Sequence, residues 1–74
     1  MERTLLNLTN NEEGFILSIE GGHHARNRLE SLGIRPGKKI RKMSSQFFKG
    51  PVVISIDGRE IALGHGLARK IIIR

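Results

Sequence analysis

The sequence predicts a small all-β barrel or sandwich, and three features of its composition lead to that prediction. The chain has 74 residues, enough for one domain, and so small a domain must bury most of its apolar side chains to be stable. Ten isoleucines and two valines against three alanines favour strands over helices. Nine glycines against two prolines indicate many turns. Because no repeat or linker divides the chain, we expect residues 1–74 to form a single domain.

The N-terminal segment is expected to supply one end of the barrel and the first strand. The segment 10–14 is rich in Asn and Gly, which accept positive φ, and is predicted to be a turn. Residues 15–19 are predicted to form a strand, with Phe15 in the core. The side chains expected to cover the end of the barrel are Leu5, Leu6 and Leu8.

A short helix is predicted over residues 24–32, because Ala25, Leu29 and Leu32 recur at the spacing that places them on one face. Arg26 and Arg28 then fall on the other faces and are expected to be exposed.

The residues after this helix predict how it ends. Gly33 occupies the position that takes a left-handed conformation, and Ile34 would pack back on Leu29 in a Schellman ending. Pro36 and Gly37 suit a type II turn, since Pro fixes φ and Gly accepts the positive value that follows. We therefore expect a sharp turn into the next strand.

That next strand, over residues 38–44, is heavily charged. Its two apolar members, Ile40 and Met43, do not alternate cleanly, which predicts an edge strand or a bent one. A loop is expected over residues 45–51.

The clearest predicted element is a hairpin over residues 52–63. Asp57 and Gly58 lie between two apolar runs and predict a type I′ turn, which pairs Ile54 with Ile61. A helical turn over residues 64–70 and a closing strand over residues 71–73 complete the chain. About five strands, one short helix after the first strand and a helical turn before the last together predict a small barrel.

Several functional classes are excluded or disfavoured. Without cysteine there is no disulfide framework, thiolate metal site or cysteine nucleophile, and a disulfide-free domain of this size favours the cytoplasm. No apolar run approaches the roughly 20 residues of a membrane span. There is no phosphate-cradling loop, nucleophile elbow or suitably placed carboxylate pair, so we expect no enzyme.

The net charge of +6 is unevenly distributed. Residues 1–20 hold one arginine and four glutamates and sum to −3, whereas residues 21–74 hold twelve basic and three acidic residues and sum to +9. Such an excess suits nucleic acid, anionic lipid or an acidic protein surface, and it also serves simply to keep a small domain in solution.

The nucleic-acid interpretation and a separate metal-binding hypothesis each name specific residues. A nucleic-acid surface would need aromatic platforms, and the chain has three phenylalanines and no Tyr or Trp, so we expect no stable nucleic-acid complex. A weak Fe(II) or Zn(II) contact is conceivable at three histidines, whose simpler interpretation is exposed side chains, and no cofactor is required. The basic candidates are Lys38, Lys39, Arg41, Lys42, Lys49, Arg26 and Arg28, and the metal candidates are His23, His24 and His65.

A protein-contact surface is predicted around the 45–51 loop. Phe47 and Phe48 are adjacent, so in an extended segment they cannot both face inward, unless both fold over an opening of the barrel. An exposed aromatic beside Lys49 and Pro51 would anchor a partner.

The order of these features resembles the FeoA family of ferrous iron transport proteins. The resemblance is carried by Leu29-x-x-Leu32-Gly33-Ile34-x-Pro36-Gly37, then Gly50-Pro51, then Asp57-Gly58 with Ile61-Ala62-Leu63, then Ala68-x-x-Ile71. The chain departs from the family at Asn11, where a glycine is common, and at Lys42, where a β-branched apolar residue is commoner.

The resemblance implies an SH3-like β-barrel that works in the cytoplasm with FeoB, the large membrane GTPase that imports Fe(II). It implies an accessory or regulatory role through protein contact, and we expect Arg26 and Arg28 to join the 47–51 loop in docking. The same barrel resembles the C-terminal domain of iron-dependent repressors, which leaves a metal- or peptide-binding regulatory role as an alternative.

Overall fold

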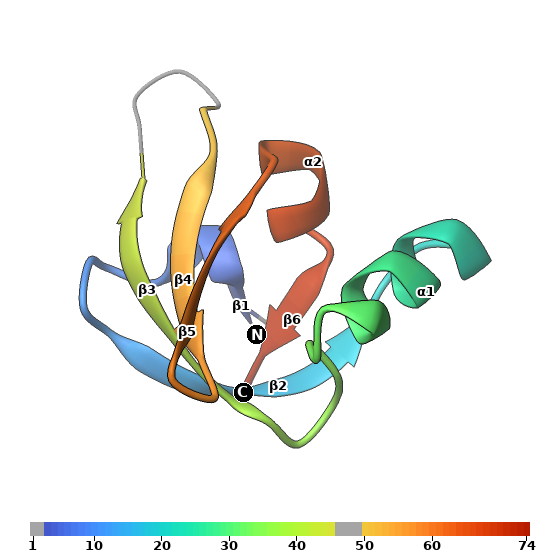
Figure 1. Cartoon of the computed structure of the whole chain (residues 1–74), viewed down its shortest axis with the longest axis horizontal. Coiled ribbons are helices and arrows are strands. Elements are labelled where there is room, and N and C mark those ends of the chain that lie inside the picture. Colours follow the sequence, from blue (N-terminus) through green and yellow to red (C-terminus); the bar gives the residue numbers. More distant parts are fainter. Residues whose placement is uncertain (1–2, 46–49) are drawn as a thin grey trace.

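The computed structural model describes residues 3–45 and 50–74, and it is built on one curved antiparallel sheet with two short helices (Figure 1). The strands lie in the order β1-β6-β2-β3-β4-β5. In chain order the elements are β1 (Arg3–Thr4), the 3₁₀ helix η1 (Leu5–Asn7), β2 (Glu13–Ile19), α1 (His23–Ser31), β3 (Lys39–Ser45), β4 (Val52–Ile56), β5 (Arg59–Leu63), α2 (His65–Ala68) and β6 (Ile71–Ile73). The all-β prediction is confirmed, with six strands in place of about five.

The additional strand is β1, which pairs with β6 through Arg3 opposite Ile73 and Thr4 opposite Ile72. Two residues are too few to show an alternating pattern, so the sequence alone gave no signal for this strand. The 3₁₀ helix that follows begins at a capping box, in which the Thr4 side chain accepts from the Leu6 amide and Asn7 accepts from the Thr4 amide. As predicted, Leu5 and Leu8 are buried in the core and Leu6 packs against it.

The predicted turn at residues 10–14 is shorter than expected. Asn11 takes the positive φ of 71°, whereas Gly14 lies within β2. A Cβ at Gly14 would lie 2.6 Å from Cγ2 of Ile73, so this glycine is required by close packing between β2 and β6 and not by a turn.

Phe15 does not lie in the core, contrary to the prediction. Along β2, Ile16 is buried and its two neighbours Phe15 and Leu17 are exposed, because successive side chains of a strand point to opposite faces. A run of three apolar residues therefore leaves two of them on the outer face of the sheet.

The helix α1 and its ending follow the prediction closely. Ala25 and Leu29 are buried and Leu32 packs against the core. Gly33 has φ of 85° and its amide donates to the Glu30 carbonyl, while the Ile34 amide donates to the Leu29 carbonyl, which is the Schellman pattern. The turn that follows is also confirmed: Gly37 has φ of 92° after Pro36, and the Lys38 amide donates to the Arg35 carbonyl.

The strand β3 is bent, as predicted, but it is not an edge strand. It lies between β2 and β4, and its pairing with β4 shifts register between Lys42 and Ser44. The two sides of β3 differ: Ile40 and Lys42 are buried, whereas Lys39 and Arg41 point to the outer face.

The hairpin from β4 to β5 matches its prediction in both turn type and register. Asp57 and Gly58 both have positive φ, as a type I′ turn requires, and Ile54 lies opposite Ile61. The predicted helical turn is α2, and the last strand, β6, lies between β1 and β2 in the sheet.

Candidate functional site

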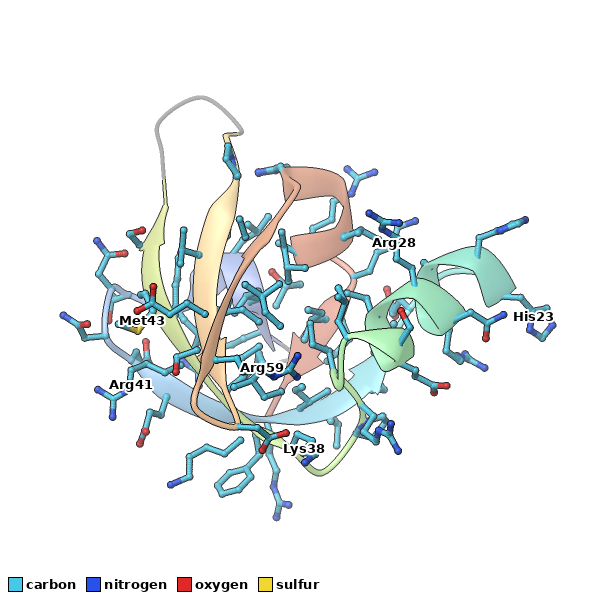
Figure 2. All side chains as sticks on the ribbon, in the orientation of Figure 1. His23, Arg28, Lys38, Arg41, Met43 and Arg59 are labelled. Carbon is cyan, nitrogen blue, oxygen red and sulfur yellow. The ribbon has the colours of Figure 1, made fainter. Side chains whose placement is uncertain are left out.

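The predicted contact surface begins on α1, where Arg26 and Arg28 are both exposed, Arg28 being labelled in Figure 2. Residues two positions apart on a helix do not face the same way, so the two arginines lie on different flanks of α1. Neither arginine makes an ion pair with a carboxylate of the described residues. Beside Arg26 lies a shallow hollow of about 270 Å³. It is lined by Ser18, Ile19, Arg26, Glu30 and Pro36.

The second part of the predicted surface is the loop before β4. Phe47, Phe48 and Lys49 lie outside the described residues, and Pro51 is exposed immediately before Val52. The N-terminal end of β4 and the helix α1 lie at separate parts of the molecule, with α2 between them in Figure 1. Pro51 and the two arginines therefore do not form one continuous patch.

The three candidate metal ligands are spread over two helices. His23 and His24 are exposed in the first turn of α1, where Figure 2 shows His23 at the outer end of the helix, and His65 begins α2. Across residues 3–45 and 50–74, no three His, Asp or Glu side chains gather closely enough to hold a metal ion together. A metal contact at any of these histidines remains a prediction.

The charged strand does not present a continuous basic stripe. Lys38 Nζ lies 2.9 Å from Asp57 Oδ2 and Arg41 Nη2 lies 2.8 Å from Glu13 Oε2, so both cations are already paired with carboxylates (Figure 2). The hydrogen bond from Lys38 holds the pKa of the Asp57 carboxyl below its usual range.

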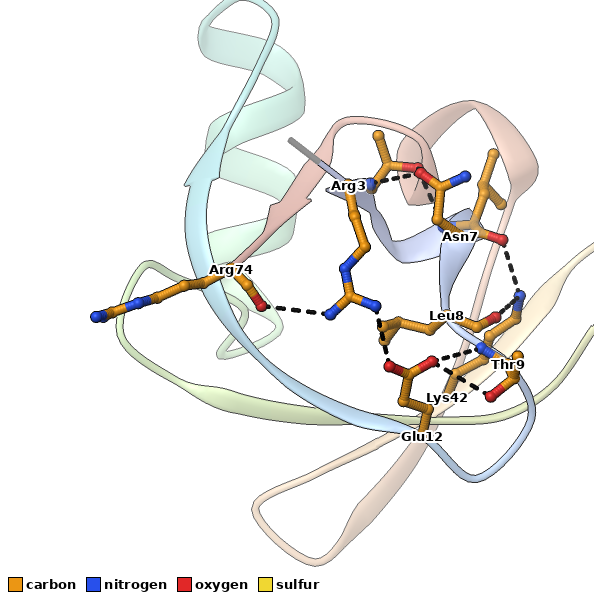
Figure 3. A network of polar contacts seen from close by, with 9 residues as sticks. Arg3, Asn7, Leu8, Thr9, Glu12, Lys42 and Arg74 are labelled. Atoms are coloured by element: carbon orange, nitrogen blue, oxygen red, sulfur yellow. Dashed lines mark hydrogen bonds and ion pairs between the residues drawn. The ribbon is translucent and has the colours of Figure 1, made fainter. Parts of the chain in front are cut away.

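Lys42, another of the predicted basic residues, is turned inward. Its side chain is 5% exposed, and its Nζ donates to the Leu8 carbonyl at 2.8 Å and to the Leu6 carbonyl at 3.2 Å (Figure 3). Of the predicted basic group on β3, Lys39 is left as the exposed cation without a carboxylate partner in the described part of the chain.

A second polar cluster holds the N-terminal segment beside Lys42. Glu12 accepts from the Thr9 amide at 2.9 Å and from Arg3 Nη1 at 3.0 Å (Figure 3). These two hydrogen bonds, the one from the Thr9 backbone first, hold the pKa of the Glu12 carboxyl below its usual range. The cluster is structural, because it joins Arg3 of β1 to Thr9 and Glu12 in the segment before β2.

Sequence reasoning missed the outer face of β2. Phe15 and Leu17 are 51% and 47% exposed, and they are the large apolar side chains that stand out to solvent among the described residues. The signal was present in the sequence: a strand with three successive apolar residues cannot turn all of them inward.

None of the described helices is long and apolar enough to span a bilayer. The described surface consists of a curved sheet, a helix with two exposed arginines and a small apolar area on β2. These features define the class of protein as a small β domain.

Comparison with known proteins identifies the family. The model of the FeoA domain matches residues 3–74. A relative from Methanocaldococcus jannaschii, named "Putative Fe(2+) transport protein A", is 44% identical over 62 residues, which are 84% of this chain and 73% of that protein. The chain belongs to the FeoA family, as its motifs indicated.

Solved structures confirm the SH3-like fold. A crystal structure of an iron uptake regulatory protein, FeoA, is 36% identical, with a TM-score of 0.88 over 100% of this chain and 96% of that chain. A manganese-dependent transcriptional repressor in complex with manganese gives a TM-score of 0.90 at 23% identity, over 99% of this chain and 36% of that chain. At that identity the second likeness concerns the fold alone.

Proposed function

We propose that this chain is an accessory or regulatory protein of ferrous iron uptake that acts in the cytoplasm by direct contact with a FeoB-type membrane GTPase. The observation that supports this most strongly is membership of the FeoA family over residues 3–74, together with the relative named for Fe(2+) transport. Iron is the cargo of the transporter in this proposal, and catalysis by this chain is not part of it.

The predicted docking residues are Arg26 and Arg28, with the loop residues Phe47, Phe48, Lys49 and Pro51. The exposure of both arginines supports their part in this assignment, because unpaired surface cations speed the encounter with an acidic partner. Since Pro51 lies apart from α1, a partner that uses both would have to span two areas of the surface.

An amide-resolved NMR titration of labelled protein with the purified cytoplasmic portion of the transporter tests this function. We expect saturable shifts that include residues 23–28 and 47–51. The variant Arg26→Glu/Arg28→Glu should bind about tenfold more weakly, mainly through slower association. Silence at about 100 μM, a concentration that reveals even weak contacts, with both the cytoplasmic portion and the detergent-solubilised whole transporter would contradict the proposal.

The proposed contact requires no metal on this chain. Adding EDTA should therefore leave the titration unchanged, and replacing His23, His24 and His65 with Ala should have no effect on affinity. A loss of binding in either experiment would favour the metal-dependent regulatory alternative.

A further inference from the structure

The outer face of β2 carries an apolar ridge that the fold does not cover. Phe15 and Leu17 lie two residues apart on one face of the strand, and each exposes about half of its side chain. A single exposed apolar residue is ordinary, but two large ones side by side form a patch.

The strands on both sides of Phe15 place a cation next to it. Lys39 on β3 is its register partner, so the two side chains share the outer face. On the other side, the Arg74 amide donates to the Phe15 carbonyl at 2.9 Å, directly after β6, and Arg74 is exposed. The aromatic ring therefore stands between two basic residues.

Leu17 lies where the pairing of β2 with β6 shifts register, between Ile16 and Ser18, and it is exposed. The Gly37 amide donates to the carbonyl of the preceding residue, Ile16, which brings Gly37 alongside β2. A Cβ at Gly37 would meet no atom within 4 Å, so open space lies there.

The neighbouring row of side chains on the same face differs from the ridge in its charge balance. Across β2, β3, β4 and β5, Glu13 lies opposite Arg41, Arg41 opposite Ser55 and Ser55 opposite Glu60. Arg41 is paired with Glu13 at 2.8 Å, so this row balances its own charge. Lys39, in contrast, has no carboxylate partner among residues 3–45 and 50–74.

We propose that Phe15 and Leu17, with Lys39 and Arg74 at their sides (the β2 ridge), are the docking site for an acidic segment of the FeoB-type transporter that carries an apolar side chain. The inference rests on the proposed function and adds a contact surface to the one that includes the arginines of α1. An apolar centre with a charged rim is the usual anatomy of a protein contact, in which the aromatic residue supplies affinity and the rim supplies orientation.

Charge argues against two other occupants. A second copy would also carry a net charge of +6 and would bring like charges together around two facing ridges. Single-stranded nucleic acid binds on successive aromatic platforms, whereas this ridge offers one ring beside an aliphatic side chain.

The test is a binding titration of the transporter's cytoplasmic portion with five forms of the full chain, namely the wild type, the Arg26→Glu/Arg28→Glu variant and three further variants. Phe15→Thr/Leu17→Thr removes the apolar centre with residues that suit an exposed strand. Lys39→Glu reverses one rim charge, and Arg69→Glu, at an exposed position after α2, makes the same charge change away from the ridge. Circular dichroism melts show which forms are folded.

We expect the Thr double variant to bind at least about tenfold more weakly than the wild type. Lys39→Glu should lose about fivefold at low salt and less at high salt, with Arg69→Glu close to the wild type. If the Thr variant unfolds, the difference in affinity between Lys39→Glu and Arg69→Glu still shows whether the ridge takes part in binding.

Other outcomes overturn the inference in distinguishable ways. Wild-type affinity in both ridge variants, with loss in Arg26→Glu/Arg28→Glu, would place docking on α1 and leave the proposed function standing. Absence of any binding by the wild type, both to the cytoplasmic portion and to the detergent-solubilised whole transporter, would reject the proposed function and the ridge with it. A concentration-dependent dimer abolished by Phe15→Thr/Leu17→Thr, or oligonucleotide binding lost in the same variant, would assign the ridge to those occupants instead.

Discussion

Lys42 is a buried charge whose role is to hold another segment of the chain in place. Its ammonium bridges the carbonyls of Leu6 and Leu8, and its own backbone carbonyl accepts from the Asn11 amide. Carbonyl groups at the end of a short 3₁₀ helix need donors when they are buried. A β-branched residue at this position could fill space but could not supply those donors.

Replacing Lys42 with Met, which keeps the length of the side chain, should therefore destabilise the fold by about 1–3 kcal/mol, since the two carbonyls lose their donor. Urea unfolding measures the change, and Lys39→Met on the outer face of the same strand is the matched control, expected within about 0.5 kcal/mol of the wild type. Equal stability of the Lys42 variant would mean that desolvating the ammonium costs as much as its hydrogen bonds contribute.

The carboxyls of Glu12 and Asp57 predict how stability depends on pH. Both pKa values are lower in the folded chain, through the Thr9 amide and Arg3 for Glu12 and through Lys38 for Asp57. Each group therefore stabilises the fold above its unfolded pKa of about 4, and that contribution is lost as the pH falls through the lower folded value.

Unfolding free energies measured from about pH 6 down to pH 2 should fall most steeply below pH 4. The variant Glu12→Gln should show a shallower decline and converge with the wild type at the acid end. Parallel curves for the two proteins would contradict the assignment of this pH dependence to Glu12.

The ending of helix α1 depends both on the local backbone conformation and on a long-range contact with β5. Gly33 holds a φ of 85°, and a Cβ there would lie 2.8 Å from Nη2 of Arg59. That Arg59 nitrogen donates to the Leu32 carbonyl at 2.7 Å. One glycine thus allows both the Schellman ending and the bond that ties β5 to the helix.

Gly33→Ala should cost about 1–2 kcal/mol from the left-handed backbone alone, and more if Arg59 is displaced from the Leu32 carbonyl. Gly37→Ala shares the positive φ but has open space around it, so the difference between the two variants isolates the Arg59 contact. Gly66→Ala, within α2 and without positive φ, should be neutral or slightly stabilising. Thermal melts rank the three variants, and equal losses in the first two would argue against the contact.

Across the whole molecule, the features predictable from sequence are those set by neighbouring residues. The Schellman ending at Gly33 and the type I′ turn at Asp57 each follow from a few adjacent positions, and both are confirmed. The β1–β6 pairing joins residues about seventy positions apart, and the bonds of Lys42 reach Leu6 and Leu8, so neither has a local signature. Phe15 was misplaced because apolarity was weighed without the alternation of the strand.

The candidate site was predicted less well, because exposure alone does not show which surface residues lie together. Arg26 and Arg28 were correctly predicted to face solvent, but the fold separates them from Pro51. Likewise, the charges of β3 were counted as one basic surface, whereas Lys38 and Arg41 are paired and Lys42 is buried.

The charges around β3 predict weak binding of nucleic acid at this strand despite the net charge of +6. Affinity for DNA and its salt dependence both rise with the number of phosphates neutralised, and the described residues of β3 leave only Lys39 exposed and without a carboxylate partner. Fluorescence anisotropy with a duplex should give a dissociation constant of about 0.1 mM or weaker at physiological salt. The double variant Glu13→Gln/Asp57→Asn frees Arg41 and Lys38 and should bind more tightly, with a steeper salt slope. Tight binding by the wild type would mean that the engaged cations remain available to phosphate, and the nucleic-acid alternative would then replace the contact with the transporter.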